Sequence, residues 1–468
     1  MATPQQQPTT ATRTEHPQAR RGDGSAAPAP LRMTVLGTGY LGATQAICMA
    51  ALGFEVLGLD VDADKVASLA AGEVPFYEPG LPELLVKALD SGRLRFTTDF
   101  AEAAAFADVH FLCVGTPQSK DSYAADLAHV RSAVRQLAVH LDRPALVIGK
   151  STVPVGTAAE VAVMLQELAP AGSQVELAWN PEFLREGFAV EDTMNPDRLV
   201  FGVSSDWAEG RLRQVFEPVI SVHDTPVIVT DLPTAELVKV AANSFLATKI
   251  SYINAMAEVC EVTGADVSAL AKALSYDDRI GGRFLHPGLG FGGGCLPKDI
   301  RAFIHRAQEL GAGDAVAFLG EVDAINKRCR ARTVDLVRQM SGGDLTGVRI
   351  AALGAAFKPN SDDIRDSPAL DVACSLQHEG ALVTVFDPVA MDNARRTHPE
   401  LHFGTSALQA AQDATVVVLL TEWSDFRLID PEVLGKVVAD RNIVDGRNAL
   451  NPDQWRHAGW SFRALGRP

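Results

Sequence analysis

Cysteine is scarce in this 468-residue sequence, and no two of its six cysteines form a CxxC pair. Widely separated cysteines are typical of a reducing compartment and offer no zinc knuckle. We therefore expect a cytoplasmic protein without a bound metal. The six are Cys48, Cys113, Cys260, Cys295, Cys329 and Cys374.

Basic residues are also in deficit, because 42 Lys and Arg face 58 Asp and Glu for a formal net charge of −16. This balance argues against a general nucleic-acid or anionic-membrane surface, although a local basic pocket for a phosphorylated metabolite remains possible. No stretch approaches 18 uninterrupted apolar residues, so we expect no membrane-spanning segment. Residues 1–30 are rich in Pro, Gln, Ala and Thr without an apolar run, which predicts a disordered tail and not a signal peptide.

The length of the chain exceeds what one hydrophobic core supports and predicts two or three domains. Two alternations of apolar strands and helices flank a mainly helical stretch. We therefore expect an α/β protein with two Rossmann-like, doubly wound parallel-sheet domains, joined by a helical central domain with a long connecting helix. The expected boundaries are 31–220, 221–342 and 343–468.

The first alternation opens with a dinucleotide fingerprint. An apolar strand at 32–36 runs into Gly37-Thr38-Gly39-Tyr40-Leu41-Gly42, an apolar helix at 43–52 follows, and a strand at 55–59 ends in Asp60. The glycines suit a tight turn, close approach of a pyrophosphate and helix–strand packing, while the acid suits ribose hydroxyls and repels a 2′-phosphate. The unit predicts NAD in preference to NADP.

Three polar motifs follow later strands of the same alternation, near 109–114, 145–148 and 175–178. Parallel strands present their carboxyl ends at one edge, where ligands bind. Turns and helix caps would explain any single motif, but three at one edge favour a site. The motifs are Gly115-Thr116-Pro117, Lys150–Thr157 and Asn180–Gly187.

A glycine-rich loop, Gly290–Asp299, carries one thiol, Cys295, just before Pro297. Proline is favoured in the first turn of a helix, so the thiol should lie at a helix N-terminus, where the dipole favours a thiolate. A buried, inert cysteine is the alternative reading. Upstream, Lys239 and Asn243 are four residues apart on a largely apolar helix and share one face, which suggests a polar pocket.

Beyond a helical run at 311–340, the second alternation has strands near 349–353, 382–386 and 415–420. It lacks a GxGxxG, so a second dinucleotide is not expected. Basic residues near its strand ends could instead receive a nucleotide diphosphate, although exposed Arg and Lys are common on such loops. They are Lys358, Arg365 and Arg447.

Taken in order, the motifs resemble those of the UDP-glucose/GDP-mannose dehydrogenase family from about Met33 to about Asn448. Besides the motifs above, the resemblance rests on Glu78-Pro79-Gly80-Leu81, Phe357-Lys358-Pro359, Asp362–Pro368 and Asp445–Asn448. The sequence departs from the family pattern at Leu41, Gly294 and Leu296. Gly294 stands where Ser usually precedes the cysteine, which affects the loop around the sugar.

The resemblance implies oxidation of a sugar-nucleotide primary alcohol to a carboxylate, with two NAD⁺ reduced and a thioester on the enzyme. It implies UDP-glucose as substrate, UDP-glucuronate as product and a homodimer paired through the central helices. Cys295 would be the nucleophile, Lys239 and Asn243 would stabilise an oxyanion, and Asp299, Glu182 and Thr152 would position or activate water. The implied cofactor-binding residues are Gly37, Gly39, Tyr40, Leu41, Gly42, Asp60, Lys65, Thr116, Thr152, Glu186, Lys298 and Arg365. The implied substrate-binding residues are Glu182, Phe183, Leu184, Lys239, Asn243, Phe284, Leu285, Gly288, Gly292, Phe357, Lys358 and Arg447, with Arg279 of the partner subunit.

Three other functions compete with this one. The same chemistry could act on GDP-mannose or a UDP-N-acetylhexosamine. A two-electron β-hydroxyacid dehydrogenase also spaces Lys and Asn one turn apart, but it needs neither a nucleophilic thiol nor a second nucleotide-binding half. An NAD-binding redox sensor could use Cys295 as an oxidisable thiol, yet it would not need Lys239, Asn243, Glu182 and Asp299 together.

Overall fold

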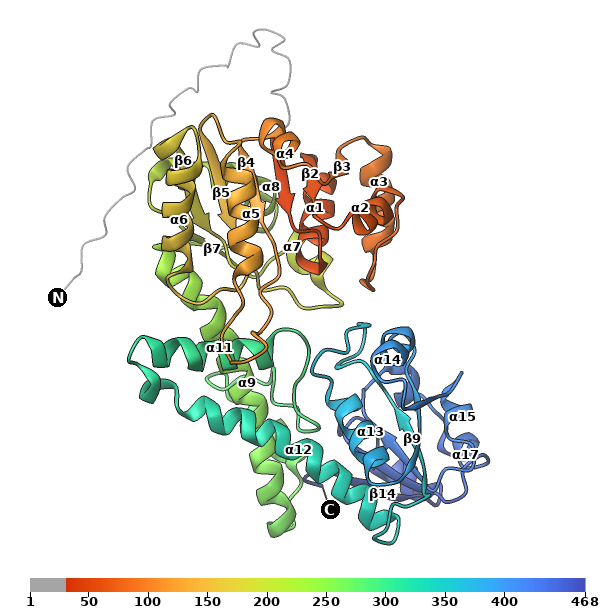
Figure 1. Cartoon of the computed structure of the whole chain (residues 1–468). Helices are drawn as coiled ribbons and strands as arrows, with labels where there is room; N and C mark the ends of the chain where they lie inside the picture. The colour runs from red at the N-terminus through yellow and green to blue at the C-terminus, as the bar shows by residue number, and fades with distance from the viewer. Residues whose placement is uncertain (1–30, 468) are drawn as a thin grey trace, which may run out of the picture.

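The computed structural model describes residues 31–467, and the predicted tail lies outside the described residues. Figure 1 shows two α/β domains, with helices α9, α11 and α12 running between them. Within the described range, no helix combines the length and apolarity needed to cross a bilayer.

The first domain is an eight-stranded sheet in the order β3-β2-β1-β4-β5-β6-β7-β8. All neighbouring pairs are parallel except β6 and β7, which meet antiparallel. The central strands are buried on both faces, which is what a parallel sheet covered by helices requires. The strands are β1 (Arg32–Leu36), β2 (Glu55–Leu59), β3 (Leu94–Thr97), β4 (Val109–Leu112), β5 (Ala145–Gly149), β6 (Val175–Trp179), β7 (Leu199–Gly202) and β8 (Val227–Thr230).

Two hydrophobic cores sandwich this sheet. Helices α1, α3 and α8 cover one face, where Phe111 packs, and α4, α5 and α6 cover the other, where Leu112 packs. The helices of this domain are α1 (Tyr40–Ala51), α2 (Ala63–Ala70), α3 (Leu81–Asp90), α4 (Phe100–Phe106), α5 (Ala128–Ala138), α6 (Thr157–Leu168), α7 (Ala189–Met194) and α8 (Asp206–His223).

The second domain is a six-stranded, fully parallel sheet in the order β11-β10-β9-β12-β13-β14. Its core is separate and centres on the buried strands β9 and β12. The strands are β9 (Arg349–Leu353), β10 (Leu382–Phe386), β11 (His402–Phe403), β12 (Val416–Leu419), β13 (Asn442–Asp445) and β14 (Ser461–Ala464). The helices are α13 (Pro368–His378), α14 (Met391–Thr397), α15 (Ala407–Ala410), α16 (Ser424–Arg427), α17 (Pro431–Leu434) and α18 (Pro452–His457).

Long helices connect the two sheets. The 32-residue α9 (Leu232–Thr263) begins at Asp231, whose side chain accepts a hydrogen bond from the Thr234 amide, and ends at Gly264. It packs against α10 (Val267–Ser275), α11 (Leu296–Glu309) and α12 (Phe318–Met340). The fold class is therefore confirmed: two parallel-sheet α/β domains with helices between them.

Several elements differ in extent from the sequence-based expectation. Strand β8 lies beyond the expected boundary at 220 and extends the first sheet. The helix expected at 311–340 begins only at Phe318, after a short 3₁₀ turn at Gly313–Val316. The strand expected at 109–114 ends at Leu112.

Candidate active site

The fingerprint loop between β1 and α1 offers a cradle for a dinucleotide. The N-terminus of α1, at Gly39, has no side-chain cap, so the first backbone amides of the helix can bind phosphate oxygens. A Cβ on Gly39 would meet nothing within 4 Å, whereas one on Gly42 would lie 1.7 Å from the Gly37 carbonyl oxygen. The loop is therefore open where a pyrophosphate would approach and closed where helix and strand pack. Tyr40 and Leu41 start the helix.

Asp60 ends β2 beside this cradle. Its carboxylate accepts from the Thr38 amide (2.8 Å) and pairs with Lys65 Nζ (2.9 Å). Burial pushes the pKa of Asp60 upward, but Lys65 and the backbone donors outweigh it and hold the pKa below its usual value. The ionised acid suits the ribose of NAD, so these residues fit the cofactor.

A second polar cluster gathers where α9 and α11 meet the loop after β6. On α9, Lys239 Nζ lies 2.9 Å from Glu182 Oε1, and Asn243 Nδ2 donates to Asp299 Oδ2 at 2.7 Å. Asp299 also pairs with Lys298 Nζ at 2.6 Å. The expected common face of Lys239 and Asn243 is present, and both side chains are buried.

Cys295 caps the N-terminus of α11 beside this cluster, as its position before Pro297 predicts. The predicted ease of ionisation is wrong for the ligand-free chain. Close packing of protein around the thiol and the carboxylates of Asp299 and Glu182 raise its pKa to about 12, despite partial compensation by nearby lysines. Cys295 is nonetheless an exposed residue, so a substrate can approach it.

Lys239 stays cationic in this cluster. Burial tends to lower its pKa, but Glu182 and the other acidic groups around it raise the pKa above its ordinary value. A buried ammonium is a preorganised donor for negative charge that develops nearby. Phe183 lies under it, with Nζ 5.7 Å from the ring centroid, and the Leu184 amide donates to Glu182 at 2.6 Å.

Thr152 lies on the loop after β5, and its carbonyl accepts from Thr116 Oγ1 at 2.7 Å. A largely apolar cavity of about 320 Å³ extends from Thr152 and Asp299 along α11. The three polar motifs at the sheet edge thus lie around one region, because Lys150 Nζ also donates to Asn180 at 2.9 Å.

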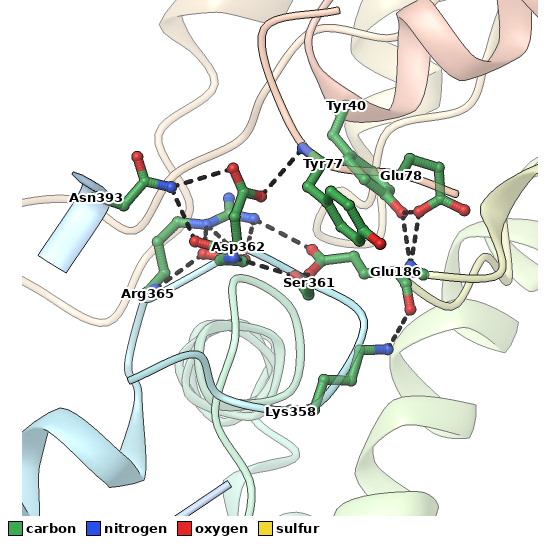
Figure 2. Close-up of polar contacts among 11 residues, drawn as sticks. Tyr40, Tyr77, Glu78, Glu186, Lys358, Ser361, Asp362, Arg365 and Asn393 are labelled. Carbon is green, nitrogen blue, oxygen red and sulfur yellow. Dashed lines mark hydrogen bonds and ion pairs between the residues drawn. The ribbon is translucent and has the colours of Figure 1, made fainter. Parts of the chain in front are cut away.

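Glu186 connects the two sheet domains (Figure 2). Lys358 Nζ donates to its carbonyl at 2.6 Å, and Ser361 Oγ and Arg365 Nη2 approach its carboxylate at 3.3 Å each. Burial and the nearby Asp363 raise the pKa of Glu186 to about 7, although Arg365 and Lys358 oppose the shift. We call this set of contacts the Glu186 junction.

Glu78, to which the sequence assigned no role, holds the loop that follows Glu186. Its buried carboxylate accepts from the amides of Gly187 (2.6 Å) and Ala189 (2.7 Å), and from the hydroxyl of Tyr40. Figure 2 shows Tyr40 and Glu78 meeting beside Glu186. The fingerprint helix is thereby tied to the interdomain loop.

Arg447 is occupied by backbone contacts. It donates to the carbonyls of Leu420 (2.6 Å), Gly290 (3.1 Å) and Phe357 (3.1 Å), so it joins the cysteine loop to the second domain. Arg279 is exposed and pairs with Asp277 in the loop that follows α10, outside the polar cluster.

The remaining expected substrate residues lie on the loop leading to Cys295. Leu285 is buried, Phe284 has a left-handed φ of 65°, and Gly292 packs against Asp366. Two asparagines that sequence reasoning passed over hold this loop. Asn254 Oδ1 accepts from the Gly288 amide, and Asn326 makes two hydrogen bonds with the backbone of Phe291.

Comparison with known families matches the chain in three consecutive parts. Residues 31–220 match the NAD-binding domain of the UDP-glucose/GDP-mannose dehydrogenase family, residues 233–328 its central domain and residues 351–452 its UDP-binding domain.

Two curated relatives are named UDP-glucose 6-dehydrogenase. That of Rhizobium meliloti (strain 1021) is 41% identical over 94% of this chain and 100% of its own length. That of Bacillus subtilis (strain 168), TuaD, is 38% identical over 93% of each chain.

Solved structures agree with this fold. The UDP-glucose dehydrogenase of Pyrobaculum islandicum superposes with a TM-score of 0.87 at 36% identity, covering 96% of this chain and 100% of the other. The UDP-D-ManNAc dehydrogenase of Pyrococcus horikoshii gives 0.81 at 28% identity, covering 93% and 99%.

Proposed function

The chain belongs to the UDP-glucose/GDP-mannose dehydrogenase family and is an NAD-dependent oxidoreductase; from that premise we propose that it oxidises UDP-glucose to UDP-glucuronate through a thioester on Cys295. The observation that carries the proposal is the convergence of an accessible thiol with a buried Lys–Glu pair and a buried Asn–Asp pair. Bound NAD⁺ accepts a hydride in each of the two oxidations.

In the first oxidation, the primary alcohol loses a hydride and its hydroxyl proton and becomes an aldehyde. The proton leaves through water held by Asp299 and Thr152, which border the same cavity. Negative charge on the reacting oxygen is stabilised by the Lys239 ammonium and the Asn243 amide.

The second oxidation needs a covalent adduct, because an aldehyde carries no further hydride that can leave without added nucleophile. The sulfur of Cys295 adds to the aldehyde carbon while the thiol proton passes to a neighbouring carboxylate. The carbonyl oxygen becomes the alkoxide of a thiohemiacetal, which Lys239 and Asn243 stabilise. Loss of the second hydride gives a thioester. Water then attacks the thioester, with Glu182 as base, and releases the carboxylate and the free thiol.

The proposed base has a matching environment. Glu182 is held by Lys239 and by the Leu184 amide, so its carboxylate is oriented toward the cluster. The thiol pKa of about 12 fits a nucleophile that is deprotonated only when the substrate is in place.

NADH yield per sugar nucleotide tests the proposal. With limiting UDP-glucose we expect two NADH per molecule, and little turnover of GDP-mannose or UDP-N-acetylmannosamine supplied in parallel. Two NADH from one of the other sugars instead would overturn the substrate and keep the mechanism.

Cys295→Ser tests the mechanism separately. This variant should bind NAD as the parent does but lose two-NADH turnover, whereas Cys374→Ser, a cysteine outside the cluster, should retain it. Full two-NADH yield from Cys295→Ser would exclude the thioester.

We also propose that the enzyme is a homodimer paired through α9. Phe245, Tyr252 and Val259 recur every seven residues on this helix and are 67%, 51% and 49% exposed, which is a seam that a second copy of α9 would cover. Arg279 would then reach the site of the partner subunit. Tyr252→Glu should give a monomer by light scattering, whereas Tyr123→Glu, an exposed tyrosine on another segment, should not.

A further inference from the structure

We propose that the second sheet domain carries a zinc-binding site formed by Cys374, His398 and Glu400. Cys374 lies on α13, His398 caps the C-terminus of α14, and Glu400 follows before β11. Their ligand atoms all lie within 4.8 Å of one another. None of the three belongs to the active-site cluster or to the Glu186 junction.

The spacing of the three atoms is close to that of a tetrahedral metal site. Sγ of Cys374 lies 3.3 Å from His398 Nδ1 and 3.7 Å from Glu400 Oε1, and Nδ1 lies 3.0 Å from Oε1. Bond lengths of about 2.3 Å to sulfur and about 2.1 Å to nitrogen or oxygen put the same edges at about 3.6, 3.6 and 3.4 Å. Small side-chain shifts, a few tenths of an ångström, would admit the ion.

The backbone that carries the ligands is held in place. The side-chain amide of Gln377, on α13, donates to the Glu400 carbonyl at 2.5 Å. The backbone amide of His398 donates to the Ala394 carbonyl at 2.8 Å. Leu401, next to Glu400, is buried in the core. The cluster therefore needs little ordering before it binds an ion.

The ligand types select the metal. A thiolate and an imidazole are poor ligands for Mg²⁺ or Ca²⁺ and good ligands for Zn²⁺, and one carboxylate completes three of four tetrahedral positions. The fourth would hold water.

The proposal departs from the expectation of no bound metal, which rested on the scattered cysteines. Cys374 and His398 are 24 residues apart, so the fold and not the local spacing brings them together. A hydrogen-bonded triad without any ion is the competing explanation of the same geometry, and it predicts no metal affinity.

Cobalt(II) binding to the full chain tests the site, because tetrahedral thiolate ligation gives a sulfur-to-cobalt charge-transfer band. The experiment is done in the Cys295→Ser background, so that the active-site thiol cannot contribute. We expect one cobalt per chain with this band, displaced by zinc.

Further variants in the same background assign the ligands. Cys374→Ser should abolish the charge-transfer band, and His398→Ala and Glu400→Gln should each weaken zinc binding at least tenfold. His402→Ala, an exposed histidine on the neighbouring strand, should bind as the parent does. Zinc binding unchanged by Cys374→Ser and Glu400→Gln, or cobalt bound without a thiolate band, would overturn the proposal.

Discussion

The ionisation of Cys295 depends on single charged neighbours. Close packing of protein around the thiol is the first cause of its raised pKa, and the Asp299 carboxylate makes the largest electrostatic contribution in the same direction. The N-terminus of α11 lies where sequence places it, but the pKa of the thiol there is raised and not lowered. The charge on Asp299 thus contributes to keeping the thiol protonated.

Asp299→Asn should accelerate alkylation of Cys295 by iodoacetamide at pH 8. The substitution removes a negative charge and leaves the Lys298 ammonium unpaired, and both changes lower the thiol pKa. Each unit of decrease raises the thiolate fraction about tenfold. Peptide mass spectrometry measures the rate at Cys295. Asp277→Asn, an exposed aspartate, is the control, and a rate in Asp299→Asn no faster than the parent's would contradict the electrostatic account.

Asp60 should determine the preference of the enzyme for NAD over NADP. Asp60→Ala should weaken NAD binding by roughly 10- to 100-fold, because hydrogen bonds to a charged acceptor contribute about 1.5–3 kcal/mol. It should also narrow the preference over NADP, since the repulsion of a 2′-phosphate disappears. Fluorescence titration measures both affinities. Asp64→Ala, an exposed neighbour, should leave them unchanged, and an undiminished preference for NAD in Asp60→Ala would count against this role.

At the scale of elements, the cysteine loop tolerates change unevenly. Gly290 has a φ of +87°, and a Cβ there would lie 2.0 Å from Asn326 Oδ1, a buried group that holds the loop. The three atoms nearest to a Cβ on Gly294 would all belong to the guanidinium of Arg365, the end of a flexible side chain. The departure from the family pattern at Gly294 thus makes room for an arginine of the Glu186 junction.

Gly290→Ala should therefore destabilise the chain by more than about 2 kcal/mol, since left-handed strain adds to the clash. Gly294→Ala should cost less than about 1 kcal/mol. Urea denaturation midpoints compare the two. Equal losses would mean that the loop is uniformly rigid.

The Glu186 junction should make stability depend on pH. The pKa of Glu186 is raised from 4.5 to about 7, so in this window the folded chain holds a proton that the unfolded chain has lost. Its contribution to the free energy of unfolding therefore falls as pH rises from about 4.5 to 7 and is constant above that.

Glu186→Gln removes this titration. The melting temperature of the parent minus that of Glu186→Gln should decrease as pH rises from 5 to 8. The same difference for Glu217→Gln, an exposed glutamate on α8, should stay flat. An increasing difference for Glu186→Gln would show that the ionised form is the one the junction favours.

Some strands are predicted well. Strands β1, β2, β9 and β10 have the bounds expected from the sequence. Sequence does not predict β7, β8, β11, β13 or β14. The edge strands β8 and β14 are only partly buried and carry little apolar pattern, whereas β7 and β13 are buried strands of only four residues.

The candidate site is likewise only partly predictable from the sequence. Local spacing predicts the common face of Lys239 and Asn243 and the place of Cys295 at a helix start. Local spacing cannot predict that Lys239 pairs with Glu182, because this contact depends on how α9 packs against the loop after β6. Nor could local spacing predict that the guanidinium of Arg447 donates hydrogen bonds to three backbone carbonyls.

At the scale of the whole molecule, the two sheets have separate cores, joined by helices and by the contacts of Glu186 and Arg447. Unfolding of such a chain need not be a single transition. A ligand that binds one domain stabilises that domain by mass action, by about 2.7 kcal/mol at a concentration of 100 times its Kd. NAD and UDP should therefore stabilise different parts.

Hydrogen exchange in mild denaturant measures this difference. NAD should slow exchange mainly in peptides covering β4, in the domain that carries the fingerprint. UDP should slow it mainly in peptides covering β12, within the range that matches the UDP-binding domain. Asp60→Ala supplies the matched control, because it should remove the effect of NAD on β4 and leave that of UDP on β12. Equal protection of both strands by either ligand would mean that the interdomain contacts are strong enough to make the chain one cooperative unit.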